Sequence, residues 1–188
     1  MVARVTVIFI CHASTDEEYV REFIHHVGPV LQSFGNSGLR FWEDSMIFAG
    51  SIWNKEIQDA ISNSIAALII VSDNLMNSSY AMTNELPRFL EEAEQHKVDI
   101  FCLYARECLI DEIIFRISVN GIEKEVKLTD YQGLNSPNTP LDSFHFKKKQ
   151  KHELIQAARK MLAVLKPRLS SLGGAPSLAR ATVSGVAR

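Results

Sequence analysis

The feature that most constrains the fold is Ile65–Val71, the most apolar run in the chain, which lies between segments patterned as amphipathic helices. A strand without polar alternation is buried on both faces, as in the centre of a parallel sheet. Val5–Ile10 has the same character, Leu39–Trp42 is shorter and half polar, and Val98–Tyr104 is a fourth candidate strand. Strands that alternate with helices predict βαβ units and a parallel sheet with helices on both faces.

The first predicted helix follows Ser14-Thr15-Asp16-Glu17, which matches a capping box with the serine as N-cap and the glutamate reaching back to it. Gly28-Pro29 is expected to kink or split this helix, because proline lacks a backbone donor and clashes with the preceding turn. One apolar stripe at helical spacing runs along it: Tyr19, Val20, Phe23, Ile24, Val27, Val30, Leu31 and Phe34.

The helix after the central strand is predicted to begin between residues 80 and 84 and to end near His96. Ser72–Ser79, which precedes it, is polar and is expected to form a loop. Pro87 is tolerated only in a first turn or at a kink, so Glu85 is expected close to the helix N-terminus.

Two further segments have clear signals. Residues 51–62 predict a helix with Ser51 as its cap. Phe115–Val119 and Ile122–Leu128 predict a β-hairpin, because Asn120-Gly121 between them is the preferred sequence of a type I′ turn.

The chain of 188 residues is long enough for one domain, predicted over residues 1–169 and closed by a helix at His152–Leu169. From Ser170 small residues and arginine dominate, so 170–188 is expected to be a disordered tail or a linker. The run Lys147–Lys151 favours a solvated helix start, with binding of an anionic partner as the minor alternative.

The predicted fold is α/β, a flavodoxin-like doubly wound parallel sheet in three layers, with strand order 2-1-3-4-5 and an extra hairpin near residues 113–128. The short second strand is expected at an edge and the first and third strands in the centre. Ligands of such sheets bind at the carboxyl ends of the strands, beside the switch point. We therefore expect His12–Ser14, Asp44–Trp53 and Ser72–Glu85 around one cleft.

Composition excludes several classes of function. The formal net charge of -2 argues against a nucleic-acid binder that depends on bulk positive charge. No apolar run approaches the roughly 20 residues of a membrane span. Cys11, Cys102 and Cys108 are odd in number and lack metal-like spacing, so reduced structural thiols in a cytoplasmic protein are expected, with some accessibility at Cys11.

Catalytic motifs narrow the choice further. No glycine-rich phosphate loop and no Gly-x-Ser-x-Gly elbow follows a strand. A receiver-type phosphoacceptor is disfavoured, because Cys11 and His12 stand where acidic metal ligands are needed, although Asp73 is near the acceptor position. Glu85 remains, with hydroxyl and amide neighbours and Tyr80 as a stacking face. On pattern alone, an ordinary first-turn glutamate is the favoured alternative.

Four segments in register resemble parts of one family. Val7–Ser14 resembles its first strand and loop, Phe41–Trp53 its second strand and BB loop, and Ala67–Ser72 its third strand. Ser79–Pro87 resembles the start of the helix with its catalytic glutamate. The family is that of Toll/interleukin-1 receptor (TIR) domains, of the bacterial type, and the resemblance covers about residues 4–105.

The resemblance implies an NAD⁺ glycohydrolase that releases nicotinamide and leaves ADP-ribose or a cyclic form. NAD⁺ is then the substrate, and no separate cofactor or metal is implied. Neutral nicotinamide leaves a cationic ring without a general acid, so one carboxylate suffices to stabilise an oxocarbenium-like transition state. The resemblance puts Glu85 in the catalytic position and implies these substrate-binding residues: His12, Ala13, Asp44, Gly50, Trp53 and Tyr80.

The chain departs from many active members at two places. Their aromatic residue stands four positions before the glutamate, where this chain has Ala81, and Tyr80 stands five before. Ala13 replaces an arginine or lysine after the first strand. The implied partners are other TIR domains in a homo-oligomer acting in bacterial defence or signalling, with no nucleic acid and no membrane. The alternative function is a non-catalytic TIR–TIR interaction module.

Overall fold

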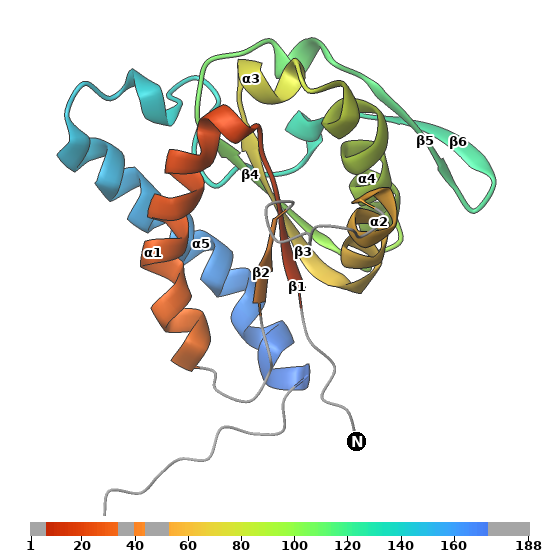
Figure 1. The fold of residues 1–188 in the computed structure, drawn as a ribbon, viewed down its shortest axis with the longest axis horizontal. Helices are drawn as coiled ribbons and strands as arrows, with labels where there is room; N and C mark the ends of the chain where they lie inside the picture. The colour runs from red at the N-terminus through yellow and green to blue at the C-terminus, as the bar shows by residue number, and fades with distance from the viewer. Residues whose placement is uncertain (1–6, 34–39, 44–52, 173–188) are drawn as a thin grey trace, which may run out of the picture.

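Four parallel strands form the centre of the molecule, which the computed structural model describes over residues 7–33, 40–43 and 53–172. The strands are β1 (Val7–Cys11), β2 (Arg40–Trp42), β3 (Ser64–Val71) and β4 (Asp99–Tyr104). Their order is β2-β1-β3-β4, and each neighbouring pair is parallel (Figure 1). The predicted doubly wound order is thereby confirmed for its first four positions.

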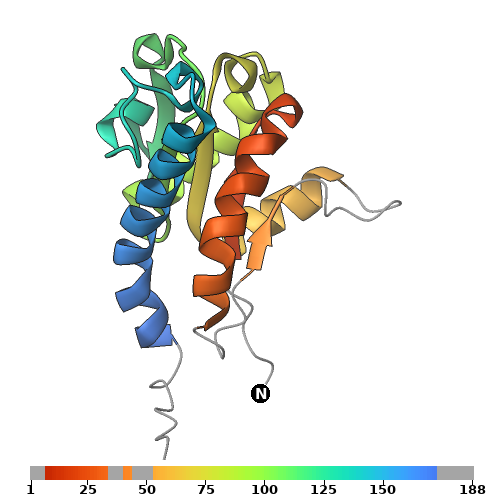
Figure 2. The same cartoon turned by 90° about the vertical axis from the view of Figure 1, so that its left-hand side faces the viewer.

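Helices cover both faces of this sheet, which confirms the predicted three layers (Figure 2). One layer consists of α1 (Glu17–Ser33) and α5 (Lys147–Leu172), which pack side by side. The other consists of α2 (Trp53–Asn63) and α4 (Leu86–Glu94). Within the described residues, no helix is long and apolar enough to cross a membrane.

The apolar character of β3 explains why it lies in the centre. Ala66, Leu68 and Ile70 pack toward α1 and α5, and the residues between them pack toward α2 and α4. All of these side chains are buried. Each fully buried leucine or isoleucine contributes about 1.5–3 kcal/mol relative to exposure, so only a strand that is apolar on both faces is stable here.

The predicted capping box at Ser14 is wrong. Residues Ser14–Asp16 form a 3-10 turn, η1, whose N-cap is Ala13, and no side chain caps it. The physical reason is that the Asp16 carboxylate turns into the protein instead of remaining at the helix start. The predicted split at Gly28-Pro29 is also wrong, because α1 continues through both residues.

The predicted loop at Ser72–Ser79 contains a short helix, α3 (Asp73–Met76). Ser72 is its N-cap, and its Oγ accepts a hydrogen bond of 3.0 Å from the Leu75 amide. Serine at an N-cap satisfies a backbone donor that the helix leaves open, so a polar stretch here folds into one helical turn.

The predicted hairpin is confirmed. It consists of β5 (Phe115–Val119) and β6 (Ile122–Val126), which are antiparallel and separate from the main sheet. Asn120 and Gly121 both have positive φ, 54° and 80°, as a type I′ turn requires. Figure 1 shows the hairpin projecting beside α4.

No fifth strand joins the sheet within the described residues, and an irregular segment lies along the outer edge of β4 instead. The Leu134 amide donates to the Cys102 carbonyl at 2.8 Å. The Asn135 side-chain amide then takes the place of a strand backbone, accepting from the Tyr104 N–H at 2.8 Å and donating to its carbonyl at 2.9 Å. Gly133 permits this approach, because a Cβ there would lie 2.6 Å from the Tyr104 ring.

The last helix is longer than predicted. It begins at Lys147, which confirms that the lysine run is a helix start, and it ends at Leu172. The predicted domain boundary at residue 169 therefore falls inside α5. Residues 173–188, Phe34 and Ser51 lie outside the described residues.

Candidate functional site

Glu85 lies in an unusual helical turn at the carboxyl edge of the sheet. Residues Ala81–Glu85 form a π-helix, η3, in which the Leu86 amide donates to the carbonyl of Ala81, five residues earlier. The turn continues into α4, with Pro87 in its first turn. In an α-helix the proline ring would clash with the carbonyl four residues before it. A wider turn relieves that clash, and π-turns of this kind are frequent at functional sites.

The π-turn also affects where Tyr80 lies relative to Glu85. In an i→i+5 turn, residues five apart lie on nearly the same side of the helix, as residues four apart do in an α-helix. Tyr80 is thereby placed on the side of Glu85. Burial raises the pKa of the Tyr80 phenol, the Glu85 charge raises it further, and a hydrogen bond with Gln58 opposes both. The phenol is therefore a neutral hydrogen-bond donor at neutral pH.

The Glu85 carboxylate is buried, with only 7% of the residue exposed, and it faces the end of β1. The Cys11 thiol donates a hydrogen bond to Glu85 Oε2 at 3.1 Å. A pair of phenylalanines sets this register, because Phe9 and Phe89 pack edge to face at 4.8 Å. Phe9 lies two residues before Cys11 on β1, and Phe89 lies one helical turn after Glu85.

His12 and Ala13, which follow Cys11, turn toward the end of β2. The His12 side chain is 7% exposed, its Nε2 lies 3.3 Å from the Glu43 carboxylate, and its Nδ1 lies 2.9 Å from the Ala13 carbonyl. The Trp42 ring, just before Glu43, packs against the Phe9 ring, and the two ring centres are 4.7 Å apart. The ends of β1 and β2 are therefore tied together next to Glu85.

The structure brings four of the seven predicted site residues to this edge: His12, Ala13, Tyr80 and Glu85. Trp53 begins α2, the helix that also carries Gln58, and its side chain is not among those described. Asp44 and Gly50 lie outside the described residues.

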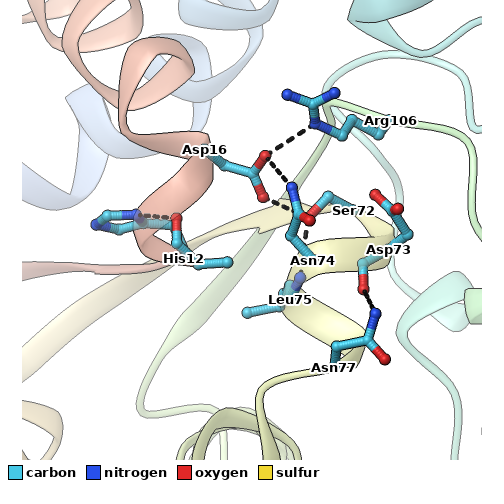
Figure 3. A network of polar contacts seen from close by, with 9 residues as sticks. His12, Asp16, Ser72, Asp73, Asn74, Leu75, Asn77 and Arg106 are labelled. Carbon is cyan, nitrogen blue, oxygen red and sulfur yellow. Dashed lines mark hydrogen bonds and ion pairs between the residues drawn. The ribbon is translucent and has the colours of Figure 1, made fainter.

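Sequence reasoning missed a second buried carboxylate, Asp16, at the same edge of the sheet. Its Oδ2 accepts from Ser72 Oγ at 2.5 Å, and its Oδ1 accepts from Asn74 Nδ2 and Arg106 Nε, both at 3.0 Å (Figure 3). Asp16 is fully buried, and the hydrogen bond to it raises the pKa of Arg106. The Arg106 guanidinium also lies 5.6 Å from the centre of the Tyr19 ring.

The Asp16 network joins three segments that lie far apart in sequence. Asp16 follows β1, Ser72 follows β3, and Arg106 follows β4. The sequence signal that could have revealed this network is that each of the three is a polar residue soon after a buried strand. Removing one partner of a buried ion pair is strongly destabilising, so this network holds the carboxyl edge in shape.

Residues 7–33, 40–43 and 53–172 contain no set of ligands for a metal ion. No group of three histidine, cysteine, aspartate or glutamate side chains is placed there to hold an ion. No disulfide links Cys11, Cys102 or Cys108 in the described part of the chain, and burial raises the pKa of the Cys102 thiol to about 12. That thiol is therefore inert at neutral pH.

Comparison with known proteins identifies the family. A sequence model of the TIR domain matches residues 8–130. A search of curated proteins found no match. Among solved structures, the chain is similar to the TIR domains of the activated Roq1 resistosome that directly recognises the pathogen effector XopQ, at 15% identity and a TM-score of 0.41. That alignment covers 82% of this chain and 84% of the other. Because the family match spans more than half of the sequence, this chain belongs to the TIR domain family.

Proposed function

We propose that this TIR domain is an NAD⁺ glycohydrolase that uses Glu85 to cleave the bond between nicotinamide and ribose. The observation that carries the proposal is the buried Glu85 carboxylate, held by a π-turn against the end of β1, with the Tyr80 phenol on the same side. Burial of a carboxylate costs free energy, because the group is removed from water. Burial of Glu85 therefore favours a catalytic role over that of an ordinary solvated glutamate.

The proposed chemistry needs one carboxylate. Nicotinamide carries a positive ring charge in NAD⁺ and leaves as a neutral molecule, so no acid has to protonate it. As the bond breaks, positive charge develops on the ribose, and a carboxylate beside the ribose stabilises it most where water is excluded. The 7% exposure of Glu85 meets that condition.

The other residues would hold the substrate. Tyr80 provides an aromatic face and a neutral hydroxyl donor for the nicotinamide or the ribose. The turn at His12 and Ala13 would border the nicotinamide. Asp44, Gly50 and Trp53 are proposed as further substrate-binding residues. The active form is proposed to be a homo-oligomer of TIR domains.

The proposed setting is the cytoplasm, in defence or signalling. Cys11, Cys102 and Cys108 form no disulfide within the described residues, which fits a reducing compartment. The product is either ADP-ribose or its cyclic form, depending on whether water or the adenine end of the substrate attacks the ribose.

The test is nicotinamide release from NAD⁺, measured by chromatography for the purified full chain at high concentration and after clustering on a multivalent support. Glu85→Ala is expected to abolish release. Glu123→Ala, which removes an exposed carboxylate from β6, is the matched control and is expected to retain full activity.

Two outcomes would contradict the proposal. One is nicotinamide release that survives in Glu85→Ala. The other is the absence of release by the wild-type chain even when clustered, which would favour the non-catalytic interaction module. Clustering is included because activity that depends on assembly changes with protein concentration.

A further inference from the structure

A second hollow lies between α1 and the start of α5, away from Glu85. Its volume is about 490 Å³. Five of its side chains are basic or titratable to a positive charge, and one is acidic. We call it the cationic groove, and its defining residues are Arg21, Glu22, His25, His26, Lys147 and Lys151.

The cationic groove is separated from the candidate active site by the sheet. α1 and α5 pack on one face, and Cys11, which contacts Glu85, faces the layer of α2 and α4. Both views of the molecule show α1 and α5 side by side (Figures 1 and 2). The groove therefore has no part in the proposed cleavage of NAD⁺.

Positive charge in the groove is poorly compensated. Lys147 and Lys151 form no ion pair with any side chain in the described part of the chain, although the whole sequence carries a net charge of -2. Among the residues that the structure describes, Arg21 forms an ion pair only with the exposed Glu17, at 3.6 Å. The first turn of α5 contains no acidic residue that would offset its positive dipole end.

The two histidines of the groove lie next to each other. His25 and His26 stack edge to face at 5.3 Å. Burial lowers the pKa of His26, and the charges of Lys151 and His25 lower it further, with Glu22 acting in the opposite direction. A positive charge on His26 is therefore disfavoured until an anion compensates it.

We propose that the cationic groove binds a small anion that carries two or more phosphates, such as a nucleoside di- or triphosphate or a free polyphosphate. Arginine and lysine are the side chains that recognise phosphate, through charge-assisted hydrogen bonds. Small-molecule sites have volumes of about 300–1,000 Å³, so the groove exceeds the needs of a single phosphate. The net negative charge of the chain disfavours a long nucleic acid as the ligand.

Binding to this groove is coupled to proton uptake. An anion stabilises the protonated form of His26, so it raises the pKa of that side chain. Affinity is therefore expected to increase as the pH falls from about 7.5 toward 6, close to the ordinary histidine range. The charges that face His26 are Glu22, His25 and Arg21 on α1 and Lys147 and Lys151 on α5.

The test is calorimetric titration of the full chain with inorganic triphosphate and, in parallel, with ATP. The double variant Lys147→Glu/Lys151→Glu is expected to lose at least about tenfold in affinity for both, because two phosphate contacts become repulsive. The matched control is Lys55→Glu/Lys166→Glu, which changes the net charge equally at exposed sites outside the groove and is expected to change affinity less than about twofold.

The outcomes distinguish binding in the cationic groove from general electrostatic attraction to the whole chain. Equal losses in the two double variants, or no binding by the wild-type chain at millimolar ligand, would overturn the proposal. ATP binding much tighter than triphosphate binding would identify a nucleotide as the ligand, and equal affinity would identify the phosphates alone. His26→Gln is expected to remove most of the pH dependence of the affinity, and a pH dependence that persists would overturn the coupling to this histidine.

Discussion

Two buried carboxylates lie at the same edge of the sheet, and their surroundings differ. Asp16 receives hydrogen bonds from a hydroxyl, an amide and a guanidinium, each supplied by the end of a strand or the helix after it. Glu85 receives a hydrogen bond from a thiol and stands in a π-turn. The guanidinium brings a full compensating charge to Asp16.

The contrast indicates different roles for the two residues. Asp16 is held by partners that satisfy its charge, so it stabilises the fold. Glu85 is held in an uncommon backbone turn, and uncommon turns persist where the surrounding structure maintains them for function. The comparison predicts that stability depends on Asp16 and that activity depends on Glu85.

The largest expected effect is the loss of activity in Glu85→Gln. Nicotinamide release should fall about 10³-fold or more, equivalent to about 4 kcal/mol of transition-state stabilisation. The free energy of unfolding should change less than in Asp16→Ala, because glutamine has nearly the same size and its oxygen can still accept the hydrogen bond of Cys11. Chromatography and urea unfolding measure the two quantities. A large loss of stability with activity retained would reverse the comparison.

Asp16→Ala is expected to have the complementary effect. It leaves Arg106 and the Ser72 hydroxyl without their partner, and the free energy of unfolding should fall by roughly 3 kcal/mol. Side-chain exposure of Arg106 at 34% allows it to regain water, which keeps the loss at the lower end for a buried pair. Urea unfolding measures the loss, and activity per folded molecule should remain near that of the wild type. An unchanged stability would contradict the role given to Asp16.

Substitutions of Tyr80 test whether the π-turn places this aromatic ring for contact with the substrate. Tyr80→Phe keeps the aromatic face and should change nicotinamide release by less than about threefold, whereas Tyr80→Ala should lower it about tenfold, the equivalent of one stacking contact. Steady-state kinetics separate the effect on KM from that on kcat. Equal activity of the alanine variant and the wild type would show that the aromatic residue is not used.

The smallest expected effect is the loss of stability on substitution of Glu94, whose pair with Lys124 serves as the reference for a more solvent-accessible carboxylate. Its carboxylate contacts Lys124 on the hairpin and accepts from the Tyr131 hydroxyl at 3.1 Å. The Lys124 hydrogen bond lowers the pKa of Glu94 below 4.5. The resulting stability is present above about pH 4.5 and is lost as the pH falls through the lower folded-state value.

Glu94→Gln should therefore lower the free energy of unfolding by less than about 1 kcal/mol at pH 7, as for other exposed pairs. The difference from the wild type should vanish below the folded-state pKa of Glu94. Urea unfolding at several pH values measures this. A loss as large as that of Asp16→Ala would show that burial does not separate the two kinds of carboxylate.

Local patterns predicted the parts of this molecule that depend on local interactions. The apolar run of β3, the hairpin turn at Asn120-Gly121 and the position of Glu85 near the start of α4 were all correctly predicted, because burial and turn chemistry act over a few residues. The family resemblance brought Glu85 and Tyr80 together and is confirmed as to the family.

The errors arose where distant residues decide the local structure. The capping box failed because Arg106, 90 residues away, draws the Asp16 carboxylate inward. The fifth strand is absent from the described sheet because the Asn135 side chain replaces a backbone ladder. The π-turn depends on packing between Phe9 and Phe89 and on Pro87, so helical periodicity alone could not reveal it.

The most direct test of the central claim is a crystal structure of the clustered chain with a non-cleavable carbocyclic analogue of NAD⁺. The measured quantity is the distance from the Glu85 carboxylate to the nearest hydroxyl of the ring that replaces the nicotinamide ribose. We predict a hydrogen bond of about 2.5–3.0 Å, with the nicotinamide against the turn at His12 and Ala13. An analogue bound elsewhere, with Glu85 still buried against Cys11 and out of its reach, would contradict the catalytic role of this residue.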